Sequence, residues 1–233
     1  MYPHPALNYQ NQIPRTPQFI TSKSIDTPDI MINSTPTTTE PNQKMNPFDA
    51  KILALFQTIH PLDQVKRAGF ILRGVSEPES VAAHSHFLSV LTLLLCDEYP
   101  DQFNREKALT IALTHDLCEA QLMDIPMPVA DEHLKESKDK AEQAITEKLF
   151  EGLDAKYAQY HAEFLSASTP EAKLVRGLDK AQMMIKISMY QKEGKGRLEE
   201  FWLNPKNFND FGLPCVSSLF DSICEAAGKP RPT

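Results

Sequence analysis

The sequence predicts an all-α protein: a compact bundle of six to eight helices that follows a disordered N-terminal tail. Two observations carry this prediction. From about residue 46 onward, apolar residues recur with helical spacing behind capping residues, and no alternating strand pattern competes with them. Before that point the chain is polar and rich in proline. The 233 residues therefore divide into a tail, 1–45, and one domain, 46–233.

The composition of the tail predicts disorder. Its large apolar residues are few and show no period, so ordering them would bury too little surface to offset the entropy lost. Three basic and three acidic residues do not resemble an arginine-rich transit peptide, although a docking tail remains an alternative. The prolines of this segment are Pro3, Pro5, Pro14, Pro17, Pro28, Pro36 and Pro41.

Capping residues and apolar spacing predict the first helices of the domain. Asn46 is a suitable N-cap for a helix over 46–59, and Pro47 suits its first position. A third predicted helix, 104–122, begins after Asn104 and is mostly apolar. Between these two, a helix over 80–99 carries five residues on one face: Val81, His84, Leu88, Leu91 and Leu95.

The second half of the domain continues the helical pattern. A long helix over 131–153 is charged on its outer side, and a shorter helix over 154–167 follows it. Thr169 as N-cap and Pro170 at the first position open a helix over 169–191. The last helix, 213–228, ends at Gly228, a common stop signal.

Bulk properties argue against several classes of protein. The net charge is −7 with both signs interspersed, which gives no reason to expect binding to nucleic acid or membranes. The longest apolar run, 90–96, is far shorter than the about 20 residues that span a bilayer. No secretory leader is expected. Four cysteines without C-x-x-C spacing indicate reduced thiols in a cytoplasmic protein: Cys96, Cys118, Cys215 and Cys224.

Three of the predicted core helices each carry an ionisable group on an apolar stretch. These groups are His84, the pair His115 and Asp116, and Asp179. Each one alone could be a hydrogen-bonded packing residue or a surface carboxylate, but buried charges are costly unless they are paired or bind metal. Two imidazoles and two carboxylates form a ligand set that suits one divalent ion such as Mn, Co, Fe, Ni, Zn or Mg. A six-coordinate ion would keep positions open for water and a substrate oxygen.

The order of these residues resembles the H…HD…D signature of the HD-domain metal-dependent phosphohydrolases. The segments around them resemble the 5′-deoxynucleotidase branch of that family, and the resemblance covers about residues 46–205. The segments are LDQVKRAGF (62–70), PESVAAHS (78–85), IALTHDLCEAQLMDIP (111–126) and EAKLVRGLDKAQMMI (171–185).

The resemblance implies a role for each matching residue. Glu119 matches the acid beside the metal-bound water, and Asp124 matches the acid that contacts the sugar. Arg67 is similar to the basic residue on the phosphate side, whereas Phe70 stands where a tryptophan usually packs against the nucleoside side of the pocket. The implied metal ligands are His84, His115, Asp116 and Asp179.

Spacing, a departure from the branch's pattern and charge add three expectations near these residues. His115 and Glu119 are four residues apart, so on a continuous helix they would share a face. Met123 replaces the glycine that the branch usually has before Asp124 and is expected to tighten the sugar pocket. Four acids around a phosphate dianion require basic residues to offset them, and arginine can grip phosphate with two hydrogen bonds. The candidates are Lys66, Arg67, Arg73 and Lys180, of which Lys66 and Lys180 fit solvated surface charges at least as well.

The resemblance implies a metal-dependent phosphomonoesterase that hydrolyses deoxyribonucleoside 5′-monophosphates by attack of metal-bound water. It also implies a homodimer. Two alternatives stay open from the residues alone. The first is a triphosphohydrolase or another nucleotide phosphatase, and the second is a nucleotide-binding regulator without turnover. Base preference and the identity of the metal are not fixed by the sequence.

Overall fold

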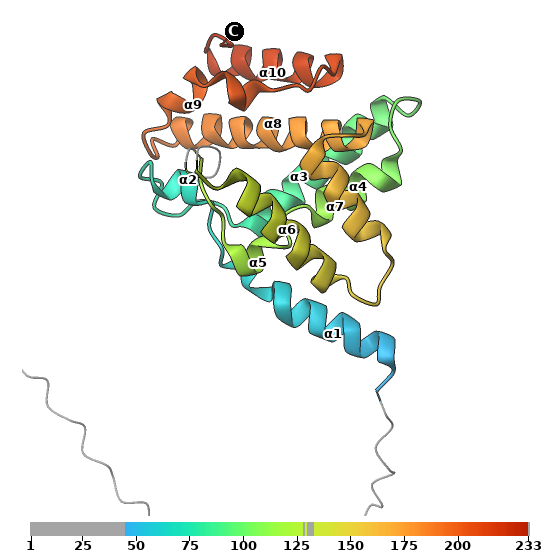
Figure 1. Ribbon diagram of the computed structural model, residues 1–233. Coiled ribbons are helices and arrows are strands. Elements are labelled where there is room, and N and C mark those ends of the chain that lie inside the picture. Colours follow the sequence, from blue (N-terminus) through green and yellow to red (C-terminus); the bar gives the residue numbers. More distant parts are fainter. Residues whose placement is uncertain (1–44, 128, 130–132, 233) are drawn as a thin grey trace, which may run out of the picture. The chain divides into compact units, whose positions relative to one another are not determined.

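Helix α8 (Pro170–Lys192) runs through the domain, and other long helices pack around it (Figure 1). The structure is a computed structural model that describes residues 45–127, 129 and 133–232; the predicted tail lies outside these residues except for Met45. As predicted, Thr169 caps α8 by accepting a hydrogen bond from the Ala172 amide, and Pro170 occupies the first turn. Several α8 side chains are fully buried, which explains its central place: Leu174, Leu178, Met184 and Ile187.

The described residues form helices and no strand, apart from one isolated bridge between Lys66 and Ser80, so the all-α prediction is confirmed. The other long helices are α1 (Pro47–Ile59), α3 (Val81–Glu98), α4 (Arg105–Thr114), α6 (Lys135–Leu149), α7 (Lys156–Ser166) and α10 (Pro214–Ala227). The short elements are η1 (His60–Asp63), α2 (Ala68–Ile71), α5 (Glu119–Leu122), α9 (Glu199–Leu203) and η3 (Pro205–Phe208). In this part of the chain no helix is both long and apolar enough to cross a membrane.

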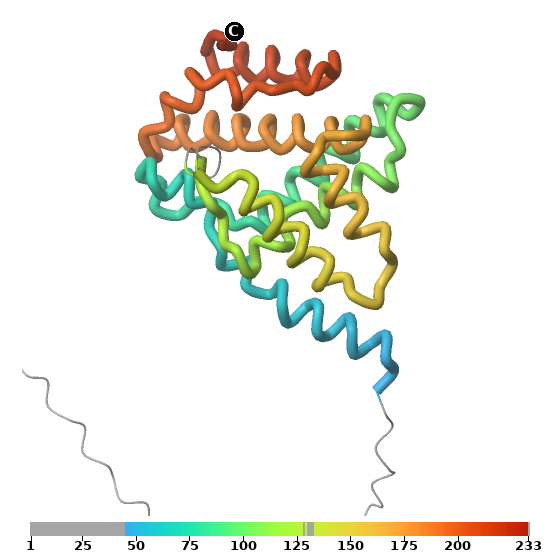
Figure 2. The backbone as a smooth tube through the Cα atoms, in the orientation of Figure 1, coloured from blue at the N-terminus to red at the C-terminus, as the bar shows by residue number. Residues whose placement is uncertain are grey.

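The helices around α8 place the candidate site residues on its inner side. Helices α3, α4 and α7 contact α8 directly, α6 packs on α7, and α10 lies along the opposite face of α8 (Figure 2). The close approach of α10 depends on Gly177, because a Cβ atom there would lie 2.8 Å from Cγ1 of Val216. Helix α10 therefore packs closely against α8.

The prediction of one continuous helix over 104–122 is wrong. Helix α4 ends at Thr114, four turn residues follow, and the short helix α5 begins at Glu119. Within the turn, hydrogen bonds run to the third preceding residue, and the Glu119 amide donates to the Asp116 carbonyl over 3.0 Å. A repeat of three residues puts residues i and i+3 on one side. Asp116 and Glu119 therefore share a side here, in place of the expected pair His115 and Glu119.

Candidate active site and metal centre

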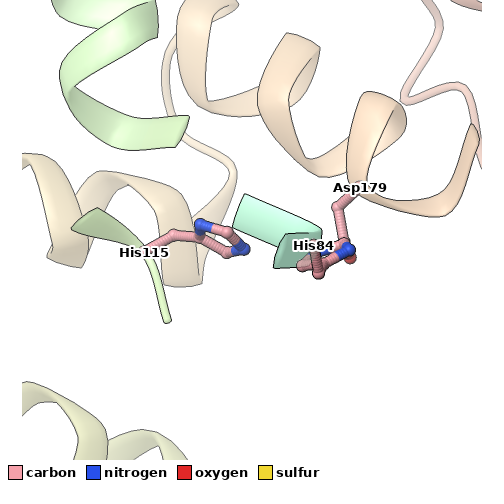
Figure 3. Close-up of side chains that lie close together, drawn as sticks. All are labelled: His84, His115 and Asp179. Carbon is pink, nitrogen blue, oxygen red and sulfur yellow. The ribbon is translucent and has the colours of Figure 1, made fainter. Parts of the chain in front are cut away.

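Side chains from three helices converge in the interior. His84 comes from α3, His115 from the end of α4, and Asp179 from α8 (Figure 3). One ligand atom from each lies within 4.8 Å of the others. Asp116 joins them, because its Oδ2 lies 3.0 Å from Nε2 of His115 and 3.9 Å from Nε2 of His84. The structure thus brings together all four residues that the resemblance implies as metal ligands.

The imidazole nitrogens in this cluster are arranged as metal ligands would be. Nδ1 of His115 donates to the Ala112 carbonyl over 3.0 Å, which leaves a lone pair on Nε2. The Nε2 atoms of His84 and His115 are buried and make no hydrogen bond to a described residue. Each nevertheless lies 3.0 Å from a carboxylate oxygen, of Asp179 and Asp116 respectively. Adjacent ligand atoms around an octahedral ion with bonds of about 2.1 Å are about 3.0 Å apart. The residues therefore fit a divalent cation.

The charges of the cluster favour ionised carboxylates. Burial opposes ionisation of Asp116, but His115, His84 and Arg67 together hold the pKa of this carboxyl well below its usual range. Burial is likewise outweighed at Asp179, where Lys180, His84 and Arg67 lower the pKa. Burial lowers the pKa of His115, but the Asp116 and Asp179 carboxylates and the Ala112 carbonyl together raise it above its usual value. A proton on His115 would therefore compete with a metal ion for the same place.

Glu119 lies beside this cluster with one free acceptor atom. The residue is buried, and its Oε2 makes no hydrogen bond to any described residue. Burial and the negative charges of Asp116 and Asp124 raise the pKa of Glu119 well above its usual value. A carboxylate whose pKa is raised is a stronger proton acceptor than an ordinary carboxylate, which suits general-base catalysis.

Arg67 connects the cluster to Asp124. Its Nη1 donates to Oδ1 of Asp124 over 3.0 Å, and its guanidinium lies 3.8 Å from carboxylate oxygens of Asp116 and Asp179. Burial alone would lower the pKa of Arg67, but these three carboxylates outweigh burial, and the pKa is raised above its usual value. The second oxygen of Asp124 accepts a hydrogen bond from the Ala68 amide over 2.6 Å. A sugar hydroxyl would therefore share the Asp124 carboxylate with two protein donors.

A cavity of about 490 Å³ opens from the cluster, a size typical of small-molecule sites. Arg73 lines it, pairs with Glu200 and lies over the ring of Phe201, 5.4 Å from its centroid. Lys180 also lines it, 3.3 Å from Oδ2 of Asp179. Lys66 is exposed and is not among the lining residues, as expected of a surface charge.

The structure bears differently on Phe70 and Met123, at the nucleoside and sugar end of the pocket. Phe70 lines the cavity, although its ring packs edge-on against Tyr190 and the residue is only 2% exposed, so its contact with a nucleoside stays a prediction. The expectation that Met123 tightens the pocket is wrong, because Met123 is 56% exposed and does not line the cavity. Its backbone has φ 65° and ψ 166°, a conformation that favours glycine and turns the side chain outward.

Several residues at the site were not predicted. Lys138 and Glu142 of α6 pair with each other and line the cavity, although their spacing is that of an ordinary exposed helix pair. Only the packing of α6 against α7 and α5 places them there, so no local signal could have found them. Gln182 carries a weak signal, because it lies three residues after Asp179 on the same helix and therefore on a similar face.

Comparisons with known proteins agree with this geometry. A family model described as HD domain matches residues 59–207. The chain is 34% identical over 180 residues to the 5′-deoxynucleotidase HDDC2 of Danio rerio, covering 75% of this chain and 86% of the relative. It is 30% identical over 190 residues to the 5′-deoxynucleotidase YBR242W of Saccharomyces cerevisiae, covering 78% of this chain and 74% of the relative.

Two solved archaeal structures share the fold. A conserved hypothetical protein from Pyrococcus furiosus superposes with a TM-score of 0.64 and 32% identity, over 76% of this chain and 98% of that chain. The PH0347 protein from Pyrococcus horikoshii superposes with a TM-score of 0.61 and 34% identity, over 77% of this chain and 98% of that chain.

Proposed function

Because this chain belongs to the 5′-deoxynucleotidase branch of the HD-domain family, we propose that it hydrolyses deoxyribonucleoside 5′-monophosphates to a deoxynucleoside and phosphate. The observation that carries the proposal is the pair of buried histidine Nε2 atoms. Each is without a hydrogen bond to a described residue and lies 3.0 Å from a carboxylate oxygen. Such an arrangement requires a positive charge between the nitrogen and the oxygen, either a proton or a metal ion, and two neighbouring His–Asp pairs of this kind suit one divalent ion.

The residues of the cluster would hold one divalent ion. Its ligands would be His84, His115, Asp116 and Asp179, all donors of nitrogen or oxygen. When bound, such an ion supplies positive charge beside the phosphoryl group and a water whose pKa is lowered from about 15.7 to as little as about 7. Oxygen and nitrogen ligands admit Mn, Co, Fe, Ni, Zn or Mg.

The remaining side chains would position the substrate and move protons. Oε2 of Glu119 accepts the proton of the attacking water, which its raised pKa and its free acceptor atom suit. Arg67 binds phosphate oxygens through two N–H groups and so offsets the repulsion from the nearby carboxylates. Asp124 holds Arg67 in place and accepts a hydrogen bond from the sugar.

A turnover screen of the purified full-length chain tests this function. Phosphate release is measured from dAMP, dGMP, dCMP and dUMP, from the matching ribonucleotides and from dATP, with each divalent metal in turn and with a chelator. We expect release from the deoxyribonucleoside monophosphates that disappears when the chelator is added. Preference for dATP would favour the triphosphohydrolase, and metal-loaded protein that binds nucleotides without releasing phosphate would favour the regulator.

The resemblance also supports a homodimer that acts on a small-molecule nucleotide. The reduced cysteines favour the cytoplasm, and the interspersed charges give no reason to expect nucleic-acid or membrane partners. Light scattering coupled to gel filtration tests the dimer, because one chain has a mass of 26.3 kDa. The four cysteines are free and buried, as suits a reducing compartment. A monomer at micromolar concentration would contradict the dimer without touching the proposed activity.

A further inference from the structure

A buried chain of polar groups lies behind His84, on the side away from Asp179. Oε1 of Gln182 is 2.7 Å from Nδ1 of His84, and the residue is only 4% exposed. Nε2 of Gln182 lies 3.3 Å and 3.1 Å from the two carboxylate oxygens of Glu79. The chain therefore runs from Glu79 through Gln182 to His84, with no step longer than a hydrogen bond.

The far end of this chain is anchored by α8. The ammonium group of Lys186 lies 3.4 Å from Oε2 of Glu79, and the Glu79 amide donates to the hydroxyl of Tyr190 over 2.8 Å. Gln182, Lys186 and Tyr190 all belong to α8, the helix that also carries Asp179. Helix α8 thus supplies the candidate ligand Asp179 and also the groups that contact His84, a second candidate ligand, and its neighbour Glu79.

The chemistry of Glu79 sets the direction of every hydrogen bond in the chain. A carboxylate only accepts hydrogen bonds, so the amide NH₂ of Gln182 must face Glu79 and its carbonyl oxygen must face His84. An amide oxygen in turn only accepts, so Nδ1 of His84 must carry the proton. Nε2 then holds a lone pair that points at the cluster, where Oδ1 of Asp179 lies 3.0 Å away.

We propose that Gln182 is a positioning residue that fixes the tautomer and ring orientation of His84, and that Glu79 acts through it. The proposal rests on the metal site of the proposed function. His115 obtains the same fixation from a backbone carbonyl, that of Ala112, which no substitution removes. The two histidines therefore differ, because only the fixation of His84 depends on side chains and can be changed by substitution. Groups that orient a ligating histidine typically contribute about 10- to 100-fold to metal affinity.

Metal affinity of the full-length chain tests the proposal without any nucleotide. The protein is stripped of metal and titrated with Mn²⁺ by calorimetry. Gln182→Leu keeps a similar size but cannot accept a hydrogen bond, so we expect Mn²⁺ to bind about 10- to 100-fold more weakly. The double variant Glu79→Gln with Gln182→Glu exchanges the amide and the carboxylate, so position 182 still accepts from Nδ1 and the chain holds a single carboxylate; it should bind within about threefold of the wild type. The matched control is Gln102→Leu, an exposed glutamine, and should bind as the wild type does.

Two further measurements separate positioning from loss of packing. In ¹⁵N NMR spectra of the metal-free protein, His84 should carry its proton on Nδ1, and Gln182→Leu should abolish that preference. Glu79→Gln should weaken Mn²⁺ binding, and the double variant Glu79→Gln with Gln182→Leu should bind no worse than Gln182→Leu alone. If Gln182→Leu does not fold, Glu79→Gln and the NMR spectrum of the wild type still decide the matter.

Several outcomes would overturn the inference. They are wild-type affinity in folded Gln182→Leu, equal losses in Gln182→Leu and in the exchange variant Glu79→Gln with Gln182→Glu, and a proton on Nε2 of His84 in the metal-free wild type. Failure of the proposed function would show differently, as a wild-type protein that binds Mn²⁺ but releases no phosphate from any nucleotide.

Discussion

The innermost part of the cavity and its outer edge are built in different ways. The floor is the cluster of His84, His115, Asp116 and Asp179, of which all but the fully buried His84 line the cavity. No side chain of the floor is more than 16% exposed, and both imidazole rings have a fixed second contact. At the rim, defined by Arg73, Lys138 and Lys180, the side chains are 21–27% exposed. Each rim cation is paired with an acid of the protein itself: Glu200, Glu142 and Asp179.

The difference separates two tasks. The floor has its geometry before any ligand arrives, so its residues can contribute to the chemical step without rearrangement. The rim cations must leave their acid partners in the protein to contact substrate oxygens. The net gain in binding free energy is therefore only the difference between two similar interactions. We therefore expect substitutions at the floor to abolish turnover and substitutions at the rim to change substrate affinity.

The largest expected effect is at the floor itself. Asp116→Ala removes a carboxylate beside both histidines and should reduce phosphate release to background and Mn²⁺ binding below detection. Activity and bound metal are measured together, the second by elemental analysis. Asp101→Ala removes an exposed carboxylate and should change neither. If the Asp116→Ala protein still binds stoichiometric metal, Asp116 is not a required metal ligand.

The second-largest effect is expected at Glu119, which takes part in proton transfer but is not a metal ligand. Glu119→Gln keeps the shape of the side chain but cannot accept a proton. We expect metal content to stay at the wild-type level while kcat falls by about 10² to 10⁴. Steady-state kinetics at saturating metal measure the loss, and undiminished turnover would remove Glu119 from the mechanism.

The burial of His161 close to His115 should affect how the stability of the protein depends on pH. Burial, aided by the nearby charge of His115, lowers the pKa of His161 to about 4, whereas the unfolded chain titrates near 6.5. The unfolded state therefore binds more protons between these values, and the free energy of unfolding should fall with decreasing pH over this window. The expected slope is at most about 1.4 kcal/mol per pH unit.

Urea unfolding of the metal-free protein at pH 7 and pH 5 measures this slope. Other groups titrate in the same window, so the comparison is made with His161→Gln, which should lose the part of the slope that belongs to His161. Identical slopes in the two proteins would mean that His161 is hydrated in the folded state.

Between floor and rim, Asp124 should discriminate between sugars. Its two oxygens already accept from Arg67 and the Ala68 amide, so little capacity remains for a second sugar hydroxyl. A buried hydroxyl without a partner costs about 1–3 kcal/mol. Hydrolysis of dAMP should therefore exceed that of AMP about tenfold or more in kcat/KM, and the same should hold for dUMP and UMP. Equal rates on both sugars would contradict this role.

The smallest effect belongs to the rim. Arg73→Ala should raise KM for dAMP about three- to tenfold and leave kcat nearly unchanged, because Arg73 already shares its charge with Glu200. Glu200→Ala is the matched partner variant and should lower KM, since it frees the arginine. A fall in kcat for Arg73→Ala would mean that Arg73 contributes to the chemical step and not only to substrate affinity.

The sequence identified the floor and, as candidates, Arg73 and Lys180 of the rim, but it did not identify Lys138. His84, His115 and Asp179 stand out because each interrupts an apolar helix, and their order along the chain completes the pattern. Lys138 gives no such sign, since its pairing with Glu142 is what an exposed helix would also show. The end of α4 at Thr114 was hidden as well, because the apolar spacing continues through the turn that follows. Tertiary packing decides both features.

The conformation of Met123 also bears on how this sequence can evolve. Its backbone angles, φ 65° and ψ 166°, belong to glycine and cost a larger residue about 1–3 kcal/mol. The methionine codon ATG differs from every glycine codon at its first two bases. The single-base intermediates, GTG for valine and AGG for arginine, are no better suited to this backbone, and valine is worse because its Cβ is branched. A lineage that has acquired methionine here can return to glycine only through an equally strained neighbour or by a double change, so the strain can persist without being useful.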